Sequence, residues 1–281
     1  MAVTPQATRH PAETTHQAIV FEDVSIQFED NPVLDGVSFA LKRGETKILL
    51  GIAGAGKSTI LKMTLGLVKP DRGRIVTLGY EVSSMREEEL FDLRRKVGMV
   101  FQESALFDSL TVEENVAYRL QEEEDLPAEE VRQRVVDSLR FVELEQTLAL
   151  FPAELSGGMR RRVAIARAII SQPEVLLYDS PTAGLDPITA HTIIALLIKE
   201  RDISHTTTLV VTTRYQDGNL IANFRYNSEQ GSLEPAHIGA GRHARTTFMV
   251  LREGRLVFEG DQDVLEASTD PYISKFVKHR V

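Results

Sequence analysis

The residues with the clearest chemistry form a glycine-rich turn at residues 51–58, which read G-I-A-G-A-G-K-S and fit the pattern G-x-x-x-x-G-K-[ST]. Glycines let successive backbone N–H groups curve around an anion, and a helix that begins here adds its positive N-terminal partial charge. Lys57 is placed to reach the β- and γ-phosphates of a nucleotide, and the Ser58 hydroxyl is placed to ligate Mg²⁺. The turn therefore predicts a nucleotide site built from Gly51, Ala53, Gly54, Ala55, Gly56, Lys57, Ser58 and Thr59.

A second chemical signal follows an apolar run later in the chain. Residues 175–178 have the pattern of a buried strand, and the run ends at Asp179. A carboxylate at the end of a parallel strand beside the phosphate turn holds Mg²⁺ through water. An apolar run that ends in Asp is weak evidence alone, but together with residues 51–58 it predicts a site for ATP and Mg²⁺.

The elements that position these residues follow from hydrophobic periodicity. Short β-type runs joined by tight turns occupy residues 18–41. Further strands are predicted at 47–50, 174–179 and 208–212, with a hairpin at 248–258. Helices are predicted from 58 to about 67, through most of 84–168, and at 191–199, 264–268 and 272–277.

Composition limits the kinds of protein that this chain can be. Of its 281 residues, 42% are hydrophobic and 26% are charged, which is typical of globular proteins. The net charge of −9 argues against bulk binding to nucleic acid, and the lack of Cys excludes disulfides and thiolate sites. No apolar run approaches the ~18 residues that span a bilayer, and the first residues lack the apolar stretch of a secretory signal. We expect a soluble protein whose membrane role, if it has one, requires a partner.

Five motifs in order along the chain resemble those of ATP-binding-cassette (ABC) ATPases. They are the phosphate turn at 51–58, a Q-loop at 97–102, a signature at 155–159 (L-S-G-G-M), the strand ending at Asp179, and a D-loop at 183–187. The resemblance extends from about Ile19 to Gly260. It implies an α/β fold, with a P-loop NTPase (RecA-like) core, an antiparallel β subdomain and an inserted α-helical subdomain.

The resemblance also implies roles for single residues. Phe28 stands where the family stacks an aromatic ring on adenine, and Gln102 stands at a Mg²⁺ contact. Ser156, Gly157 and Gly158 open a helix, so they offer a hydroxyl, bare N–H groups and a helix dipole as a second anion site. By resemblance this site, with Asp186 of the D-loop, closes on ATP bound to a second subunit. A head-to-tail homodimer with two sandwiched ATP molecules is the expected assembly.

Narrower matches at residues 105–116 and 186–189 are similar to the ATPase subunits of Mla/Mce-type systems. Such systems move phospholipids or other hydrophobic molecules between membranes. The resemblance implies separate membrane permease subunits, which dock near residues 102–116, and a lipid-binding MCE-type subunit. It also implies a cytoplasmic, peripheral location on the inner face of the cell membrane and no nucleic-acid partner.

Two positions depart from the family pattern. Ser180 stands where the family has a Glu that orients the attacking water, and Thr213 stands where it has a His that contacts the γ-phosphate. Neither hydroxyl is a plausible base near pH 7, and loss of a positioned base typically costs about 10²–10⁴ in rate. The residues expected to bind ATP are intact, so binding should persist.

Three interpretations follow from these departures. The first is a transport ATPase in which Gln102 or Glu103 positions the water. The second is a slow or inactive ATPase that acts as a nucleotide-gated clamp. The third is a soluble ABC protein that acts on DNA or ribosomes, which the net charge of −9 and the single cassette disfavour.

The predicted domain organisation has three parts. Residues 1–17 are expected to be a disordered tail, 18–260 the ABC ATPase domain, and 261–281 a C-terminal helical tail. Within the ATPase domain, a helical subdomain is expected at about 103–165. Residues 214–246 hold few aliphatic residues and are expected to form a long surface insertion.

Overall fold

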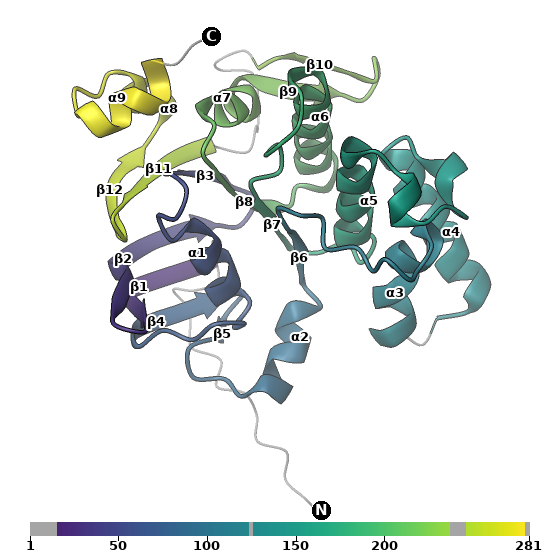
Figure 1. Ribbon diagram of the computed structural model, residues 1–281, viewed down its shortest axis with the longest axis horizontal. Coiled ribbons are helices and arrows are strands. Elements are labelled where there is room, and N and C mark those ends of the chain that lie inside the picture. The colour runs from purple at the N-terminus through teal and green to yellow at the C-terminus, as the bar shows by residue number, and fades with distance from the viewer. Residues whose placement is uncertain (1–15, 124–125, 237–245, 279–281) are drawn as a thin grey trace, which may run out of the picture.

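A six-stranded sheet lies at the centre of the fold (Figure 1). The structure is a computed structural model that describes residues 16–123, 126–236 and 246–278. The expected tail at 1–17 therefore lies almost entirely outside the described residues. The strand order is β12 (Arg255–Gly260), β11 (Thr246–Arg252), β3 (Thr46–Leu50), β8 (Thr207–Thr212), β7 (Val175–Asp179) and β6 (Val97–Val100). All neighbouring strands are parallel except the β11–β12 hairpin at one edge.

Both faces of this sheet are covered, which explains why its strands read as unbroken apolar runs. Successive side chains of a strand point to opposite faces. Accordingly Ile48 and Leu50 join one buried cluster, shared with helices of the second half of the chain, whereas Leu49 joins another. The second cluster contains residues of α1 (Lys57–Thr64), which packs between the central sheet and the antiparallel sheet.

The antiparallel sheet is built mainly from the first strands of the chain. Its order is β2 (Asn31–Lys42), β1 (Gln17–Phe28), β4 (Arg72–Thr77) and β5 (Tyr80–Glu81). Short β-type runs are predicted within residues 18–41, and the first of them are joined in one long strand, β1, whose register shifts between Phe21 and Val24. The bulge restores the inward alternation, so that Phe21 and Val24 are both buried.

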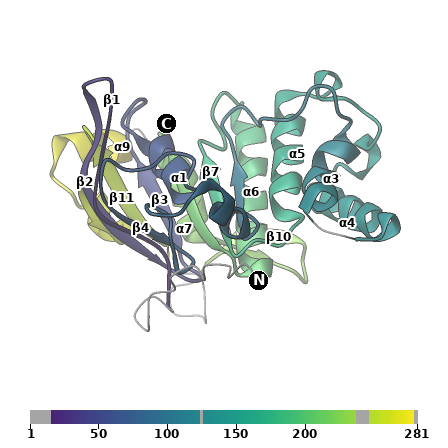
Figure 2. The same ribbon diagram turned by 90° about the horizontal axis from the view of Figure 1, so that it is seen from below.

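Three helices lie to one side of the sheets, in the stretch predicted to be a helical subdomain (Figure 2). They are α3 (Val112–Glu123), α4 (Ala128–Phe141) and α5 (Gly157–Ile169), and each of them packs on the other two. The short helix α2 (Leu90–Arg94) precedes β6. The helix α5 also packs on α6 (Pro187–Ser204), which covers the central sheet.

The region after Thr213 differs from the expected surface insertion. Residues 215–223 form α7 (Tyr215–Asn223), which buries Tyr215, Gly218 and Ile221 against the sheet. A Cβ at Gly218 would lie 2.7 Å from the Phe248 ring, so a larger residue does not fit at this position. The sequence therefore lacks the aliphatic residue here that would complete the apolar pattern of a helix. The projecting part is a hairpin, β9 (Phe224–Asn227) and β10 (Ser232–Pro235), and the rest of the expected insertion at 237–245 lies outside the described residues.

Two short helices end the described chain, where a helical tail is expected. They are α8 (Gln262–Glu266) and α9 (Pro271–Lys278). The Tyr272 hydroxyl of α9 donates to Leu251 O (3.0 Å) and accepts from Ile52 N (3.3 Å), so α9 is joined to the glycine-rich turn. Among the described residues, no helix combines the length and the apolar character needed to cross a membrane.

Candidate functional site

The carboxyl ends of four adjacent parallel strands bring most of the predicted site residues to one edge of the sheet. Leu50 of β3 pairs with Thr212 of β8, and Val211 of β8 pairs with Asp179 of β7. Val100 of β6 pairs with Tyr178, next along the sheet. The phosphate turn therefore follows β3, and Thr213 follows β8, the next strand. Asp179 is the last residue of β7 and Ser180 comes directly after it, while Gln102 lies just beyond the end of β6. Open α/β sheets bind ligands at this edge.

The glycine-rich turn is shaped by close backbone contacts. Gly54 and Gly56 have φ of 79° and 98°, in the left-handed region that favours glycine. A Cβ at Gly56 would lie 2.9 Å from Val33 O, and a Cβ at Gly51 would lie 2.9 Å from Leu251 O. A Cβ at Gly54 would meet no atom within 4 Å. The turn thus packs closely against β2 and β11 on its inner side. Around Gly54, where a phosphate would lie, it has no neighbouring atoms within reach of a Cβ.

Lys57 is a buried cation held within this turn. Its Nζ donates to Gly51 O (2.8 Å) and Ile52 O (2.7 Å), which closes the turn into a ring around the ammonium. Burial lowers the pKa of Lys57, and the charge of Asp179 opposes that shift. An anion in the turn would offset the same loss of solvation, so the site favours a negatively charged ligand.

Asp179 and Ser58 have the chemistry of a Mg²⁺ site completed by phosphate oxygens. Asp179 is buried at the end of β7, and Ser58 lies in the first turn of α1. Among the described residues, no three His, Cys, Asp or Glu side chains gather as a metal site. Two oxygen ligands from the protein suit Mg²⁺, which is usually bound through one or two protein groups together with substrate phosphates. These residues therefore fit the expected ATP and Mg²⁺.

The two departures from the family pattern stand beside these groups. Ser180 follows Asp179 with a φ of 46°, its N–H donates to Val211 O (2.8 Å), and its hydroxyl lies 3.4 Å from Asp179 Oδ1. Thr213 is exposed and lines a cavity of 260 Å³ together with Ile52 and residues of α9. No carboxylate or imidazole occupies either position.

Gln102 and Glu103, the expected alternatives for positioning water, are exposed in the segment that follows β6. Arg161 of α5 reaches this segment and donates to Phe101 O (3.1 Å). Burial lowers the pKa of Arg161, and the charges of Glu103 and Asp179 oppose the shift. Sequence reasoning did not single out Arg161, because an Arg on a helix gives no sign of which distant carbonyl it contacts.

The remaining predicted residues are placed at element ends. Phe28 ends β1 and is 47% exposed, so it is accessible to a ligand. Ser156 caps α5 by accepting from Met159 N (3.2 Å). Asp186 caps α6 by accepting from Ile188 N and Thr189 N (both 3.0 Å).

The starts of α5 and α6 touch each other through Gly158. A Cβ at Gly158 would lie 2.5 Å from Thr189 Cγ2, whereas a Cβ at Gly157 would have no neighbour closer than 3.9 Å. Gly157 and Gly158 of the signature therefore differ in role. The bare Cα of Gly158 allows α5 to pack against α6, whereas Gly157 is exposed and has open space beside its Cα.

This difference predicts opposite results for two alanine substitutions. Gly158→Ala must displace Thr189, whose side chain also bonds to Asp186, and overpacking of this kind costs about 1–3 kcal/mol. Gly157→Ala, the matched control, should leave the free energy of unfolding unchanged or slightly raise it. Urea unfolding of the nucleotide-free protein measures both, and equal stabilities would contradict the assigned contact.

A buried carboxylate that the sequence did not reveal links three segments of the site. Asp217 Oδ2 of α7 accepts from the hydroxyls of Thr182 (2.5 Å) and Thr212 (3.1 Å). Arg214 Nε lies 3.5 Å from Asp217 Oδ1. Asp217 therefore ties the segment after Ser180 to the end of β8, which carries Thr213. No spacing in the sequence distinguishes this Asp from a solvated one.

The buried state of Asp217 predicts a pH dependence of stability. Burial raises its pKa above the value near 3.9 of an unfolded chain, with the hydrogen bonds from Thr182 and Thr212 and the charge of Arg214 opposing the shift. The folded protein therefore holds this proton more tightly, and the contribution of Asp217 to stability falls as pH rises from about 4 to the raised pKa. The change in unfolding free energy from pH 4 to pH 7 should therefore be more favourable in Asp217→Asn than in the wild type, since the variant lacks this contribution. The same change from pH 4 to pH 7 in the variant and the wild type would show that Asp217 does not contribute to it.

Comparison with known proteins places this site among related ones. A family model described as "ABC transporter" matches residues 34–183. Protein TRIGALACTOSYLDIACYLGLYCEROL 3, chloroplastic, of Arabidopsis thaliana is 35% identical over 262 residues, which cover 90% of this chain and 71% of that protein. The intermembrane phospholipid transport system ATP-binding protein MlaF of Escherichia coli K12 is 31% identical over 255 residues, which cover 91% of this chain and 86% of that protein.

A solved structure agrees with these sequence relatives. The ATP-binding cassette MJ0796, in a dimeric post-hydrolysis state bound to ADP and Pi, superposes with a TM-score of 0.71 and 29% identity. The match covers 86% of this chain and 98% of that one. This likeness confirms the predicted α/β fold class, a P-loop NTPase core with an antiparallel β part and a helical part.

Proposed function

The chain belongs to the ABC transporter family as an ATP-binding subunit with an ABC ATPase domain, and on that premise we propose that it drives movement of a phospholipid or another hydrophobic molecule through separate permease subunits. The observation that carries the proposal is the similarity to the MlaF protein over 91% of this chain, together with the phosphate turn at one sheet edge. The permeases would anchor the chain peripherally at the inner face of the cell membrane. An MCE-type subunit would present the lipid.

Nucleotide binding follows from the groups at the sheet edge. The backbone N–H groups of residues 51–58 and the Lys57 ammonium would hold the phosphates, and Ser58, Asp179 and Gln102 would contact Mg²⁺. Bound Mg²⁺ would neutralise phosphate charge, which is its chemistry in this class of site. Phe28, whose ring is half exposed, would stack on the adenine.

Transport coupling would use a head-to-tail homodimer. Ser156, Gly157 and Gly158 open α5 without any acidic residue in its first turn, so the helix start suits an anion. In the proposed dimer this start and Asp186 would face ATP bound to the partner subunit. The dimeric state named for the MJ0796 structure supports a dimeric assembly.

Ser180 and Thr213 favour a second candidate function for the same fold. Without a general base at either position, the protein would bind ATP and close the dimer, but the dimer would reopen only slowly because ATP hydrolysis would be slow. The protein would then serve as a nucleotide-gated clamp rather than as a rapidly hydrolysing transport ATPase. Gln102 and Glu103, which are exposed beside the site, are the groups that would position water if hydrolysis is fast.

Co-purification from native membranes tests the transport proposal. The chain, tagged and extracted in mild detergent, should bring down a permease and a membrane-anchored lipid-binding subunit. Recovery of a sugar- or amino-acid-binding protein would overturn the lipid assignment, and recovery of nucleic acid or ribosomes would overturn transport altogether. ATP turnover by the assembled complex then distinguishes the two candidate functions. Measurable turnover would indicate a transport ATPase, and turnover indistinguishable from buffer with ATP binding retained would indicate the clamp.

A further inference from the structure

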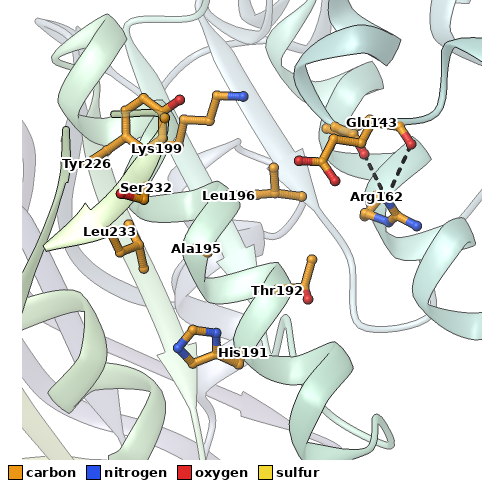
Figure 3. Close-up of a pocket in the computed structure, with 12 residues that line it drawn as sticks. Glu143, Arg162, His191, Thr192, Ala195, Leu196, Lys199, Tyr226, Ser232 and Leu233 are labelled. Atoms are coloured by element: carbon orange, nitrogen blue, oxygen red, sulfur yellow. Dashed lines mark hydrogen bonds between the residues drawn. The ribbon is translucent and has the colours of Figure 1, made fainter. Parts of the chain in front are cut away.

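A cavity of 380 Å³ lies away from the nucleotide site, between α6, the β9–β10 hairpin and the residues that follow α4 (Figure 3). None of the residues predicted for ATP, Mg²⁺ or the dimer lines it. Its size falls in the range of small-molecule sites, which begins at about 300 Å³. The cavity is therefore large enough for a ligand of its own.

One part of the cavity wall is apolar. Ala195 and Leu196 of α6 contribute to it, together with Leu233 and the ring of Tyr226 from the hairpin. The Leu196 side chain points away from the hairpin, toward Glu143 and Arg162 (Figure 3). Leu196 is buried, and the other side chains are partly exposed. This surface suits a short aliphatic or aromatic group.

The other part of the wall is cationic. The Lys199 ammonium donates to Phe141 O (3.0 Å) and lies 4.2 Å and 5.6 Å from the ring centroids of Phe141 and Tyr226. Arg162 Nη1 donates to Val142 O (3.0 Å) and Glu143 O (3.4 Å) (Figure 3). The lining residues thus include two cationic side chains, Lys199 and Arg162, and one carboxylate, that of Glu143.

The donors of both cations exceed these bonds. An ammonium has three N–H groups and a guanidinium has five. The bonds above are one from Lys199 and two from Arg162, both of the latter from Nη1. Burial lowers the pKa of Lys199, and the charges of Glu143 and Glu200 oppose the shift. A further anion would favour the charged form of this lysine.

The cavity is preformed because the hairpin is tied to α6. Buried Arg201 donates to Ile221 O (2.6 Å) and Phe224 O (2.9 Å), and Asp202 Oδ2 accepts from Tyr226 N (2.7 Å). These bonds fix Tyr226 and the start of β9 over Lys199. A preformed site loses less conformational entropy on binding than one that must be ordered.

We propose that this cavity binds a small amphipathic anion, with its carboxylate or phosphate group on Lys199 and Arg162 and its apolar body against Leu196 and Tyr226.

The ligand would bridge two parts of the molecule, since Arg162 belongs to α5 and Lys199 to α6. The same two helices touch at Gly158 and Thr189, one turn from Arg162 and Thr192 respectively. Binding would therefore fix the relative position of the helix starts that carry the signature and Asp186. This coupling step, unlike the binding itself, rests on the proposed function.

Calorimetry on the full chain tests the binding step with octanoate as the probe and octanol as its uncharged match. Octanoate should bind at least tenfold more tightly than octanol, because a charge-assisted bond contributes about 1.5–3 kcal/mol. Inorganic phosphate should bind more weakly than octanoate, because it leaves the apolar wall unused. Equal affinities of octanoate and octanol, or of octanoate and phosphate, would overturn the proposal.

Two variants locate the site. Lys199→Met and Arg162→Met should each weaken octanoate binding about tenfold or more, while Arg72→Met, an exposed control on the antiparallel sheet, should not. Because Lys199 also bonds to Phe141, folding of that variant is checked by its thermal unfolding, and Arg162→Met gives an independent reading. Unchanged affinity in both folded variants would overturn the assignment.

Coupling is measured as the Kd of a non-hydrolysable ATP analogue with and without saturating octanoate. A shift in that Kd, and the same factor in the Kd of octanoate when the analogue is present, is expected because coupling is reciprocal. An unchanged Kd would overturn the coupling step alone. No binding of the analogue in the absence of octanoate would count against the proposed function instead.

Discussion

Replacing Ser180 by Glu together with Thr213 by His is expected to raise ATP turnover by about 10²-fold or more. A positioned general base contributes about 10²–10⁴ to a hydrolytic rate, and neither residue can act as a base near pH 7. The double variant would supply a carboxylate beside Asp179 and an imidazole at the end of β8. Steady-state turnover of the assembled complex is the measurement.

The structure has room for both side chains. Ser180 already holds a Cβ at a φ of 46°, so Glu adds no new backbone strain there. Thr213 is exposed and borders a cavity of 260 Å³, which leaves space for an imidazole. The gain should therefore not be cancelled by a loss of folding.

Ser180→Gln with Thr213→His is the matched control, because Gln has nearly the shape of Glu and no basic oxygen anion. It should bind ATP as well as the double variant and hydrolyse it far more slowly. If the Glu–His variant binds ATP but gains no rate over the parent, then Ser180 is not the position of the family's Glu, or a step other than hydrolysis limits turnover.

The nucleotide site was predictable because its chemistry is local in sequence. Residues 51–58 combine glycines, Lys57 and Ser58 in one turn, and a strand precedes the turn while a helix follows it. Residues 175–178 are buried on both faces, so their apolar run was visible before the structure. Neighbouring parallel strands then bring Asp179 to the turn, which the resemblance to the family implied.

The parts that sequence reasoning missed depend on contacts between distant segments. Asp217 is identical in type to any solvated Asp, and only the fold places it beneath Thr182 and Thr212. The helix α7 lies within the predicted surface insertion, because Gly218 stands where an aliphatic residue would complete the apolar pattern of a buried helix face. The cavity at Lys199 forms between α6 and a hairpin whose register no local pattern fixed.

Lys57→Ala is expected to weaken ATP binding by about 100-fold. The variant loses a cation that would contact the phosphates, and charge-assisted hydrogen bonds contribute about 1.5–3 kcal/mol each. It also loses the two bonds from Nζ to Gly51 O and Ile52 O that hold the turn closed. Both effects act on the same site, so the loss should exceed that of any single backbone contact.

Lys62→Ala is the matched control, because Lys62 lies on the same helix with an exposed side chain. At a ligand concentration of 100 times the wild-type Kd, ATP should stabilise the wild type and Lys62→Ala by about 2.7 kcal/mol, but Lys57→Ala by only about 0.4 kcal/mol. The nucleotide-free stability of Lys57→Ala should change little, because the lost bonds are offset by removal of a buried cation. Thermal unfolding with and without Mg²⁺–ATP measures all three proteins. A full ATP-induced rise in the Tm of Lys57→Ala would mean that the phosphates bind elsewhere.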